Sequence, residues 1–149
     1  MQTFQIAPAE FKAMWVIVAI VLFVMVMAGG LLATAVRGSR SSTFEISPEG
    51  LRLRGDLYGR LIPAGHVRGS EARRVDFAVS PELQPRRRTM GTGMPGYQAG
   101  WFRLQNGDKA LVYMTDSRRA VYVPTTEGYA VLVSPADPDA FVSAVSTLR

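Results

Sequence analysis

The residues best suited to bind a charged ligand form a short run in the second half of the chain. Arg86, Arg87 and Arg88 are consecutive, and they lie in a segment from Ser80 to Gly100 that shows no regular apolar pattern. Guanidinium groups bind carboxylates and phosphates through paired hydrogen bonds. The run therefore predicts contact with an acidic segment of a protein partner or with anionic lipid headgroups. A solvated run of charge explains these residues equally well.

A glycine pattern in the same segment, Gly91-Thr-Gly-Met-Pro-Gly96, has the GxGxxG spacing of dinucleotide-binding loops. That motif works where it leaves a strand and opens a helix, so that the helix N-terminus meets the pyrophosphate. Here it precedes an expected strand, and Pro95 disfavours helical backbone at Met94. We interpret it as a glycine-rich loop with tight reversals, and we expect no cofactor.

Groups that would perform catalysis or hold a metal are sparse. The chain has no cysteine and His66 is its single histidine, which excludes thiol chemistry and multi-histidine sites. Capping of a helix explains Asp137 and Asp139, and no serine lies in a GxSxG context. The sequence therefore predicts a non-enzyme without a metal site.

Nucleic acid is not expected as a partner, because no aromatic residues interleave with the arginines. His66 is expected to be a turn residue with an ordinary hydrogen bond.

One long apolar segment divides the chain into a short N-terminal tail and a larger C-terminal part. Residues 13–36 carry no charge, and a helix of 24 residues reaches about 36 Å, enough to cross a hydrocarbon core of ~30 Å. We predict a transmembrane helix over residues 13–36, preceded by a tail of residues 1–12. A flexible linker of residues 37–42 and a folded domain of residues 43–149 are expected to follow.

The charges that flank this segment predict its orientation. Arg37 and Arg40 follow it, whereas Lys12 precedes it beside Glu10. The positive-inside rule then places the C-terminal domain in the cytoplasm, on a single-pass anchor in the inner (cytoplasmic) membrane. Ala33-Thr34-Ala35 is the competing signal, because it fits a signal-peptidase site that would release the domain outside. The apolar run before that site is longer than the ~7–15 residues of signal peptides, which favours an uncleaved anchor.

The sequence of the folded domain predicts several short strands. Thr43–Ile46 and Leu51–Arg54 alternate apolar and polar residues around a turn at Ser47–Gly50. Leu61–His66 is expected to be a turn or a single helical turn. Arg74–Val79 is expected to be a third strand, with Val75, Phe77 and Val79 on one side.

Asn106-Gly107 predicts a β-hairpin with a two-residue loop, in which Gln105 pairs with Asp108. This register sets Phe102 opposite Leu111 and Trp101 opposite Val112. One face would then carry Phe102, Leu104, Leu111 and Tyr113, and the other Trp101, Val112 and Met114. Because both faces are apolar, we expect either a barrel wall with a covered outer face or an exposed Trp101/Val112/Met114 patch used for association.

The chain ends in a predicted helix. Asp137 is a suitable N-cap, Pro138 suits the first helical position, and Phe141, Val145 and Leu148 recur on one face. Another hairpin is expected just before it, with strands at Ala120–Pro124 and Tyr129–Val133.

This order of elements resembles the bacterial PH-like (pleckstrin-homology-like) domain family, in versions that carry an N-terminal membrane anchor. The resemblance rests on Phe44–Leu51, Arg88–Tyr97 and Tyr129–Phe141. It implies a mainly β fold, a seven-stranded barrel or sandwich capped by the C-terminal α-helix, and it carries over no shared ligand or activity. The loop Ser47–Gly50 has no basic residue, which argues against the phosphoinositide site of eukaryotic PH domains.

The function expected from these observations is a membrane-anchored binding or scaffolding module that engages a protein partner or its own copies. The alternative is a domain that binds anionic lipid headgroups through Arg86–Arg88. The candidate binding residues are Arg86, Arg87, Arg88, Tyr97, Trp101, Val112 and Met114.

Overall fold

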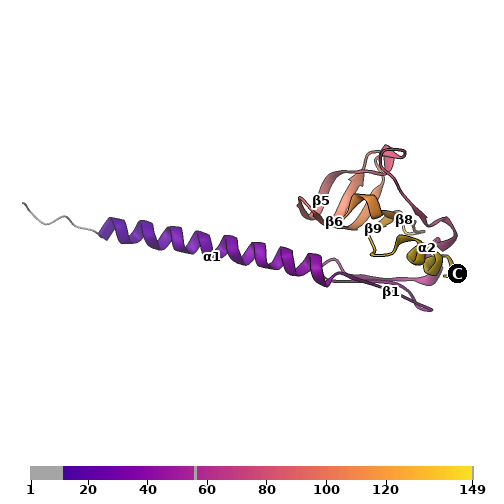
Figure 1. Ribbon diagram of the computed structural model, residues 1–149, viewed down its shortest axis with the longest axis horizontal. Coiled ribbons are helices and arrows are strands. Elements are labelled where there is room, and N and C mark those ends of the chain that lie inside the picture. Colours follow the sequence, from indigo (N-terminus) through magenta and orange to yellow (C-terminus); the bar gives the residue numbers. More distant parts are fainter. Residues whose placement is uncertain (1–11, 56, 149) are drawn as a thin grey trace, which may run out of the picture. The chain divides into compact units, whose positions relative to one another are not determined.

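The computed structural model describes residues 12–55 and 57–148, without the side chains of residues 34–41 (Figure 1). The chain divides into two compact units, Met1–Val36 and Arg37–Arg149. The predicted tail, apart from Lys12, lies outside the described residues, and so do the side chains of Arg37, Arg40, Thr34 and Ala35.

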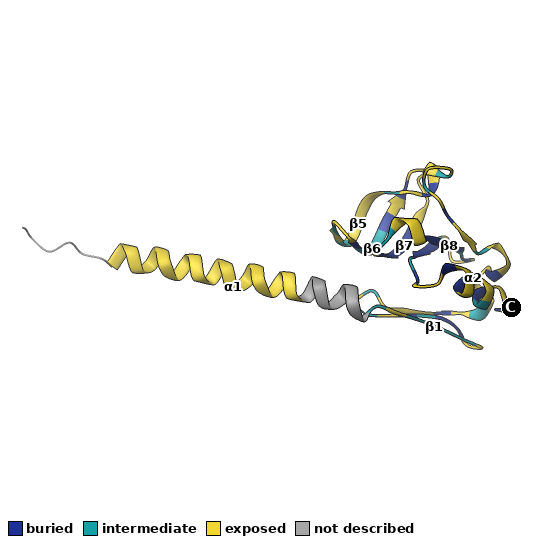
Figure 2. Cartoon of the chain, in the orientation of Figure 1, coloured by how far each residue is buried: buried dark blue, intermediate teal, exposed yellow. Residues whose placement is uncertain are grey.

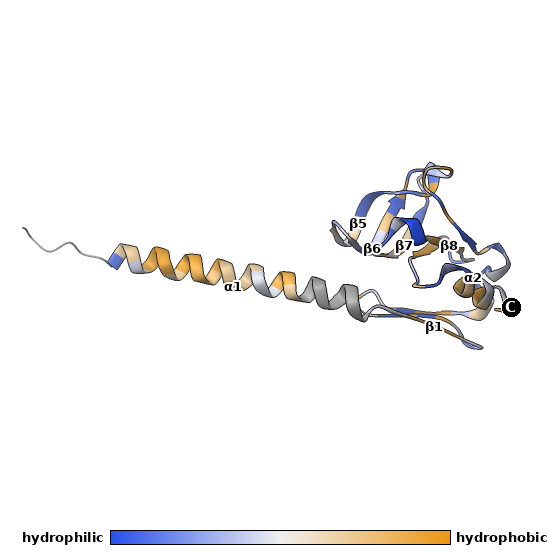
Figure 3. Cartoon of the chain, viewed as in Figure 1, coloured by the Kyte–Doolittle hydropathy of each residue, from blue (hydrophilic) through white to orange (hydrophobic). Residues whose placement is uncertain are grey.

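Helix α1 (Lys12–Ser41) contains one stretch, Lys12–Ala33, that is long and apolar enough to cross a membrane. Its described side chains are exposed, and apart from Lys12 at its start none of them is polar or charged (Figures 2 and 3). Length and composition of this kind belong both to membrane spans and to N-terminal signal sequences. The helix does not end at residue 36 but continues through most of the predicted linker. A single glycine, Gly38, costs a helix only about 1 kcal/mol, and without a proline it does not stop one.

The first sheet of the β domain contains three antiparallel strands in the order β1-β2-β3. They are β1 (Thr43–Ser47), β2 (Gly50–Arg54) and β3 (Arg60–Pro63). Leu51 and Leu53 of β2 are fully buried while Arg52 and Arg54 point outward, which confirms the alternation read from the sequence. Where a turn was expected at Leu61–His66, the structure has the end of β3 followed by one 3-10 turn, η1 (Ala64–His66).

The second sheet has six strands in the order β4-β8-β9-β7-β6-β5. They are β4 (Arg73–Arg74), β5 (Pro85–Met94), β6 (Tyr97–Leu104), β7 (Lys109–Met114), β8 (Val121–Pro124) and β9 (Ala130–Val133). Only β7 and β9 are parallel neighbours. Three further 3-10 turns are η2 (Gly69–Glu71), η3 (Pro81–Leu83) and η4 (Ser117–Arg119). The described residues therefore form nine strands in two sheets rather than seven.

The predicted third strand, Arg74–Val79, is mostly wrong. β4 ends at Arg74, and a turn follows in which the Asp76 carboxylate accepts a hydrogen bond from the Ala78 N–H at 2.9 Å. The Asp76 carbonyl also accepts the Ser80 N–H at 2.8 Å. An aspartate side chain that bonds the backbone two residues on favours a turn, and this outweighs the alternation of Val75, Phe77 and Val79.

The hairpin between β6 and β7 forms, but its register differs by one residue. Trp101 lies opposite Leu111 and Phe102 opposite Ala110. The loop has three residues rather than two, because Leu104 pairs with Asp108 through a backbone bond of 2.9 Å and Gly107 adopts a φ of 90°. Asn106 Oδ1 accepts the Asp108 N–H at 2.9 Å, which stabilises this wider loop.

The core fills both faces of the six-stranded sheet. One cluster lies between the two sheets and helix α2 (Pro138–Ser146), and the other lies under the segment that contains Val75 and Leu83. β7 and β9 are consequently buried on both faces, which confirms the expectation of a covered outer face. The predicted cap of α2 is confirmed: Asp137 Oδ1 accepts the Ala140 N–H at 3.0 Å, and Phe141, Val145 and Leu148 are buried.

Candidate binding site

The three arginines of the predicted site lie on a strand, not in a loop. β5 is the edge strand of the six-stranded sheet, and Arg86, Arg87 and Arg88 are exposed near its beginning. Its pairing with β6 is irregular between Pro85 and Met90 and regular from Gly91 to Met94. The expectation of an irregular segment from Ser80 to Gly100 is therefore wrong. β5 is held by backbone pairing at a solvent-exposed edge, so it carries no apolar alternation that a hydropathy pattern would detect.

Two of these arginines line an open groove of about 540 Å³. Arg86 and Arg88 contribute to it and Arg87 does not; the remaining lining residues are Pro85, Gly93, Met94, Pro95, Gly96, Gln98 and Phe102. Arg88 lies beside Gly93, where an added Cβ would be in ordinary van der Waals contact with Nη1 of Arg88 at 3.5 Å. Arg86, Arg87 and Arg88 form no ion pair with a carboxylate of the described residues. The groove thus has two cations available for a ligand.

Gln98 also lines the groove, but its Oε1 is buried and receives no hydrogen bond within the described part of the chain. Buried polar atoms are usually paired, so this oxygen is an exception; because it has no exposed surface, it is not a contact point for a ligand in the groove. Gln98 follows the Pro95-Gly96 turn that joins β5 to β6, and Gly96 adopts a φ of 79° there. The GxGxxG pattern therefore lies in a β-hairpin: Gly91–Met94 belong to β5, so the expected glycine-rich loop is wrong there, and a tight reversal is found only at Pro95-Gly96.

The other predicted binding residues do not join the arginines. Val112 and Met114 are buried, with 0% and 7% of their surface exposed, beneath the segment that contains Val75 and Leu83. Trp101 lies on the opposite face of the sheet with Leu111, and Tyr97 is buried in the core between the sheets. The predicted Trp101/Val112/Met114 patch is therefore wrong. The one-residue difference in register moves Trp101 to the other face relative to Val112.

Trp101 belongs instead to a cluster of cations and aromatic rings that joins the two sheets. Lys109 Nζ lies 4.2 Å from the Trp101 ring centroid, and the Arg60 guanidinium carbon lies 5.0 Å from it. Tyr129 meets Trp101 edge to face, with ring centroids 5.0 Å apart. Sequence reasoning missed Arg60, Lys109 and Tyr129, because they come from β3, β7 and the loop before β9 and share no spacing in the chain.

A hydrogen-bonded chain extends this cluster to the single histidine. Tyr129 Oη donates to Glu127 Oε2 at 3.0 Å, and His66 Nδ1 lies 2.6 Å from Glu127 Oε1. A carboxylate only accepts, so the Nδ1–H of His66 is the donor, and the predicted ordinary hydrogen bond of His66 is confirmed. The His66 and Tyr129 bonds lower the pKa of Glu127, whereas burial raises the pKa of Tyr129.

We expect Glu127 to titrate below the usual glutamate pKa of 4.5. Since its pKa is lower in the folded state, the stability it contributes is complete above the usual value and is lost as the pH falls through the folded value. His66→Ala removes the largest cause and should move the Glu127 midpoint back toward 4.5. Carboxyl carbon NMR of the full chain measures this midpoint, and the remaining carboxyl signals serve as internal controls. An unchanged Glu127 midpoint would contradict the assignment.

The described residues contain no group of three or more His, Asp or Glu side chains that could hold a metal ion. What the arrangement offers chemically is an exposed strand edge and two arginines beside a groove.

Two sheets closed by a C-terminal helix are the arrangement expected of a small β domain of the pleckstrin-homology type. The model of the bacterial PH domain family matches residues 42–148, and the chain belongs to this family. The predicted resemblance is thereby confirmed over the whole β domain. No curated protein and no solved structure matches the chain.

Proposed function

We propose that this protein is a membrane-anchored PH domain that binds an acidic, extended segment of a partner protein along β5. The observation that carries the proposal is an exposed edge strand with Arg86 and Arg88 beside one groove. An edge strand offers unpaired backbone N–H and C=O groups to an added strand, and neighbouring pockets then select its side chains. Alternate acidic residues of an extended ligand would meet the two guanidinium groups.

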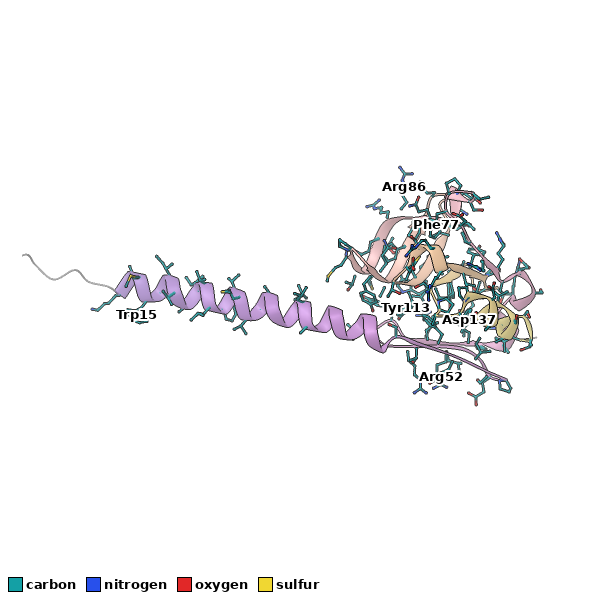
Figure 4. All side chains as sticks on the ribbon, viewed as in Figure 1. Trp15, Arg52, Phe77, Arg86, Tyr113 and Asp137 are labelled. Carbon is teal, nitrogen blue, oxygen red and sulfur yellow. The ribbon has the colours of Figure 1, made fainter. Side chains whose placement is uncertain are left out.

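The groove is lined mostly by polar surface, and Met94 and Pro95 add a smaller apolar part next to the arginines. An extended peptide can place acidic side chains on the arginines and an apolar side chain on Met94 or Pro95, which supports a peptide ligand. Arg86 and Arg52 lie on opposite sides of the β domain (Figure 4), and Arg52 belongs to the sheet that directly follows α1 in the chain. The β5 edge and the β1–β2–β3 sheet are therefore on opposite sides of the β domain, so the two surfaces can bind different partners.

The membrane anchor in this proposal is α1. Its apolar side chains are exposed on all faces, and burying such a surface in hydrocarbon is strongly favourable. Arg37 and Arg40 follow the apolar stretch in the sequence, which supports a cytoplasmic β domain on the inner membrane. Confinement to one surface raises the effective concentration of domain and ligand, so a weak strand-edge contact suffices.

The test uses the full chain in nanodiscs of neutral lipid. A fluorescein-labelled peptide of alternating Glu and Val is titrated by anisotropy, with an alternating Lys and Val peptide as the sequence control. Arg86→Gln combined with Arg88→Gln should weaken binding by at least about tenfold, since hydrogen bonds to charged groups contribute roughly 1.5–3 kcal/mol each. Arg87→Gln is the matched control, because Arg87 does not line the groove.

Equal affinity of the double variant and the Arg87→Gln control would contradict the proposal. The proposal would also be contradicted if the full chain does not bind the acidic peptide, but binds discs with anionic lipid and loses that binding when Arg86 and Arg88 are replaced. A dimer that forms in the neutral discs and is broken by the double variant would instead identify a second copy of the chain as the ligand of β5.

A further inference from the structure

The loop between β2 and β3 combines the most exposed large apolar side chain described with flanking positive charge. Leu57 has 95% of its surface exposed, more than any described large apolar residue of α1. Arg54 ends β2 on one side of the loop and Arg60 begins β3 on the other. Together with Arg52 they line a shallow groove of about 360 Å³. A leucine held in water at the tip of a basic loop has no role in the core of the domain.

Strand pairing places this loop next to the residue that follows α1 in the chain. Arg54 pairs with Thr43, and Thr43 comes two residues after the last residue of α1, Ser41. Gly55 approaches the chain so closely that a Cβ there would lie 2.5 Å from the Cα of Ser42. The loop is therefore held beside the residue that leaves α1, and this holds for any tilt of the helix.

With the uncharged stretch of α1 in the hydrocarbon core, as the proposed function has it, the length of the intervening chain keeps Ser42 near the lipid headgroups. The uncharged stretch of the helix ends at Val36, and the five residues from there to Ser41 advance it by about 8 Å. The headgroup layer on one side of a bilayer is roughly 5–8 Å thick. A loop tied to Ser42 thus reaches the outer part of this layer, where an apolar tip and cationic flanks both find partners.

The charges of the segment suit a phosphate surface. Residues 52–60 contain three arginines and one aspartate, Asp56, which lies outside the described residues. Arg54 pairs with Glu45 at 3.2 Å and Arg52 with Glu49 at 3.7 Å, and all four side chains are exposed. Exposed pairs of this kind contribute little, so lipid phosphate can replace the carboxylate. Arg60 is positioned differently, because its guanidinium stacks on the Trp101 ring.

We propose that Leu57 is a second membrane contact: it inserts into the interface of an anionic bilayer, Arg54 binds lipid phosphate, and Arg60 is held beside it on the Trp101 ring. The inference rests on the membrane anchor of the proposed function and is independent of ligand binding at β5. It assigns the β1–β2–β3 sheet to the bilayer and leaves the β5 edge for the protein ligand.

Because the chain contains no cysteine, a single introduced cysteine can be labelled specifically. Leu57→Cys, Val79→Cys and Val21→Cys are made singly in the full chain and labelled with an environment-sensitive fluorophore. Each variant is reconstituted in nanodiscs with either phosphatidylglycerol or phosphatidylcholine, with and without lipids that carry a nitroxide quencher. Val79 is the matched control, since it is an apolar loop residue with 81% of its surface exposed. Val21 reports whether α1 itself is embedded.

In phosphatidylglycerol discs the probe at residue 57 should shift to the blue, be quenched by lipid nitroxide and be protected from iodide, whereas the probe at residue 79 should behave as in water. Arg54→Gln should reduce the lipid quenching at residue 57, and Arg118→Gln, which alters another exposed and paired arginine, should not. A probe at residue 57 that iodide quenches as strongly as the probe at residue 79 would overturn the inference. Equal embedding in phosphatidylcholine discs would overturn the assignment to anionic lipid. If the probe at residue 21 is not quenched by lipid, α1 is not embedded and the membrane anchor of the proposed function is contradicted. This outcome can be told apart from the other two, which concern only the probe at residue 57.

Discussion

Gly100→Ala is expected to destabilise the β domain by at least about 2 kcal/mol, because the change combines a strained backbone with a clash. Gly100 adopts a φ of 120°, which side chains rarely allow. An added Cβ would collide with the Met90 carbonyl oxygen and lie 2.6 Å from the Cα of Gly91, and both groups are backbone. Gly91 is its direct partner on β5, with a φ of 136°. The two strands approach closely only because both positions are glycine, so relief would require β5 to move away from β6.

Urea denaturation of the full chain, followed through Trp101 fluorescence in a Trp15→Phe background, measures this effect. Gly65→Ala is the matched control: Gly65 lies in η1, has no positive φ, and has no described heavy atom within 4 Å of an added Cβ. Its unfolding midpoint should stay within the small range of ordinary surface substitutions. If the two variants unfold at the same urea concentration, the close approach of β5 and β6 is not required for stability.

The parts of the fold that the sequence predicted are those set by local chemistry. Asp137 and Pro138 determine where α2 begins, and the alternation of leucine and arginine sets the inner face of β2. In each case the interaction that decides the structure lies within a few residues, so composition and spacing are sufficient.

The parts that were missed depend on contacts between distant residues. β5 gives no hydropathy signal, because β6 holds it by backbone bonds while its outer edge faces water. Val112 seemed available for association because nothing in its own strand shows that Val75 and Leu83 cover it. For the candidate site, the sequence located Arg86–Arg88 but not the groove, since Gly93 and Gln98 approach the arginines only after the chain turns at Pro95-Gly96.

Trp101→Ala is expected to lower the stability of the β domain by about 2–4 kcal/mol, less than the full cost of a deeply buried tryptophan because the ring is partly exposed. The substitution removes the surface on which Arg60 and Lys109 stack and the edge-to-face partner of Tyr129. Each cation contributes roughly 0.5–1 kcal/mol at an exposed ring. Calorimetry of the full chain in detergent measures the loss. Trp15→Ala is the control, since Trp15 is exposed on α1 and should leave unfolding of the β domain unchanged.

The same substitution separates two roles of Trp101. If the ring acts only by filling space, Trp101→Phe restores most of the stability and nothing else changes. If the ring also positions Arg60, then Trp101→Ala should loosen the start of β3 and with it the loop that carries Leu57, because Arg60 is the first residue of that strand. Lipid quenching of a probe at residue 57 should then fall even at temperatures where the domain is fully folded. Unchanged quenching in the folded Trp101→Ala variant would confine Trp101 to packing and leave Arg54 as the residue that holds the loop to the bilayer.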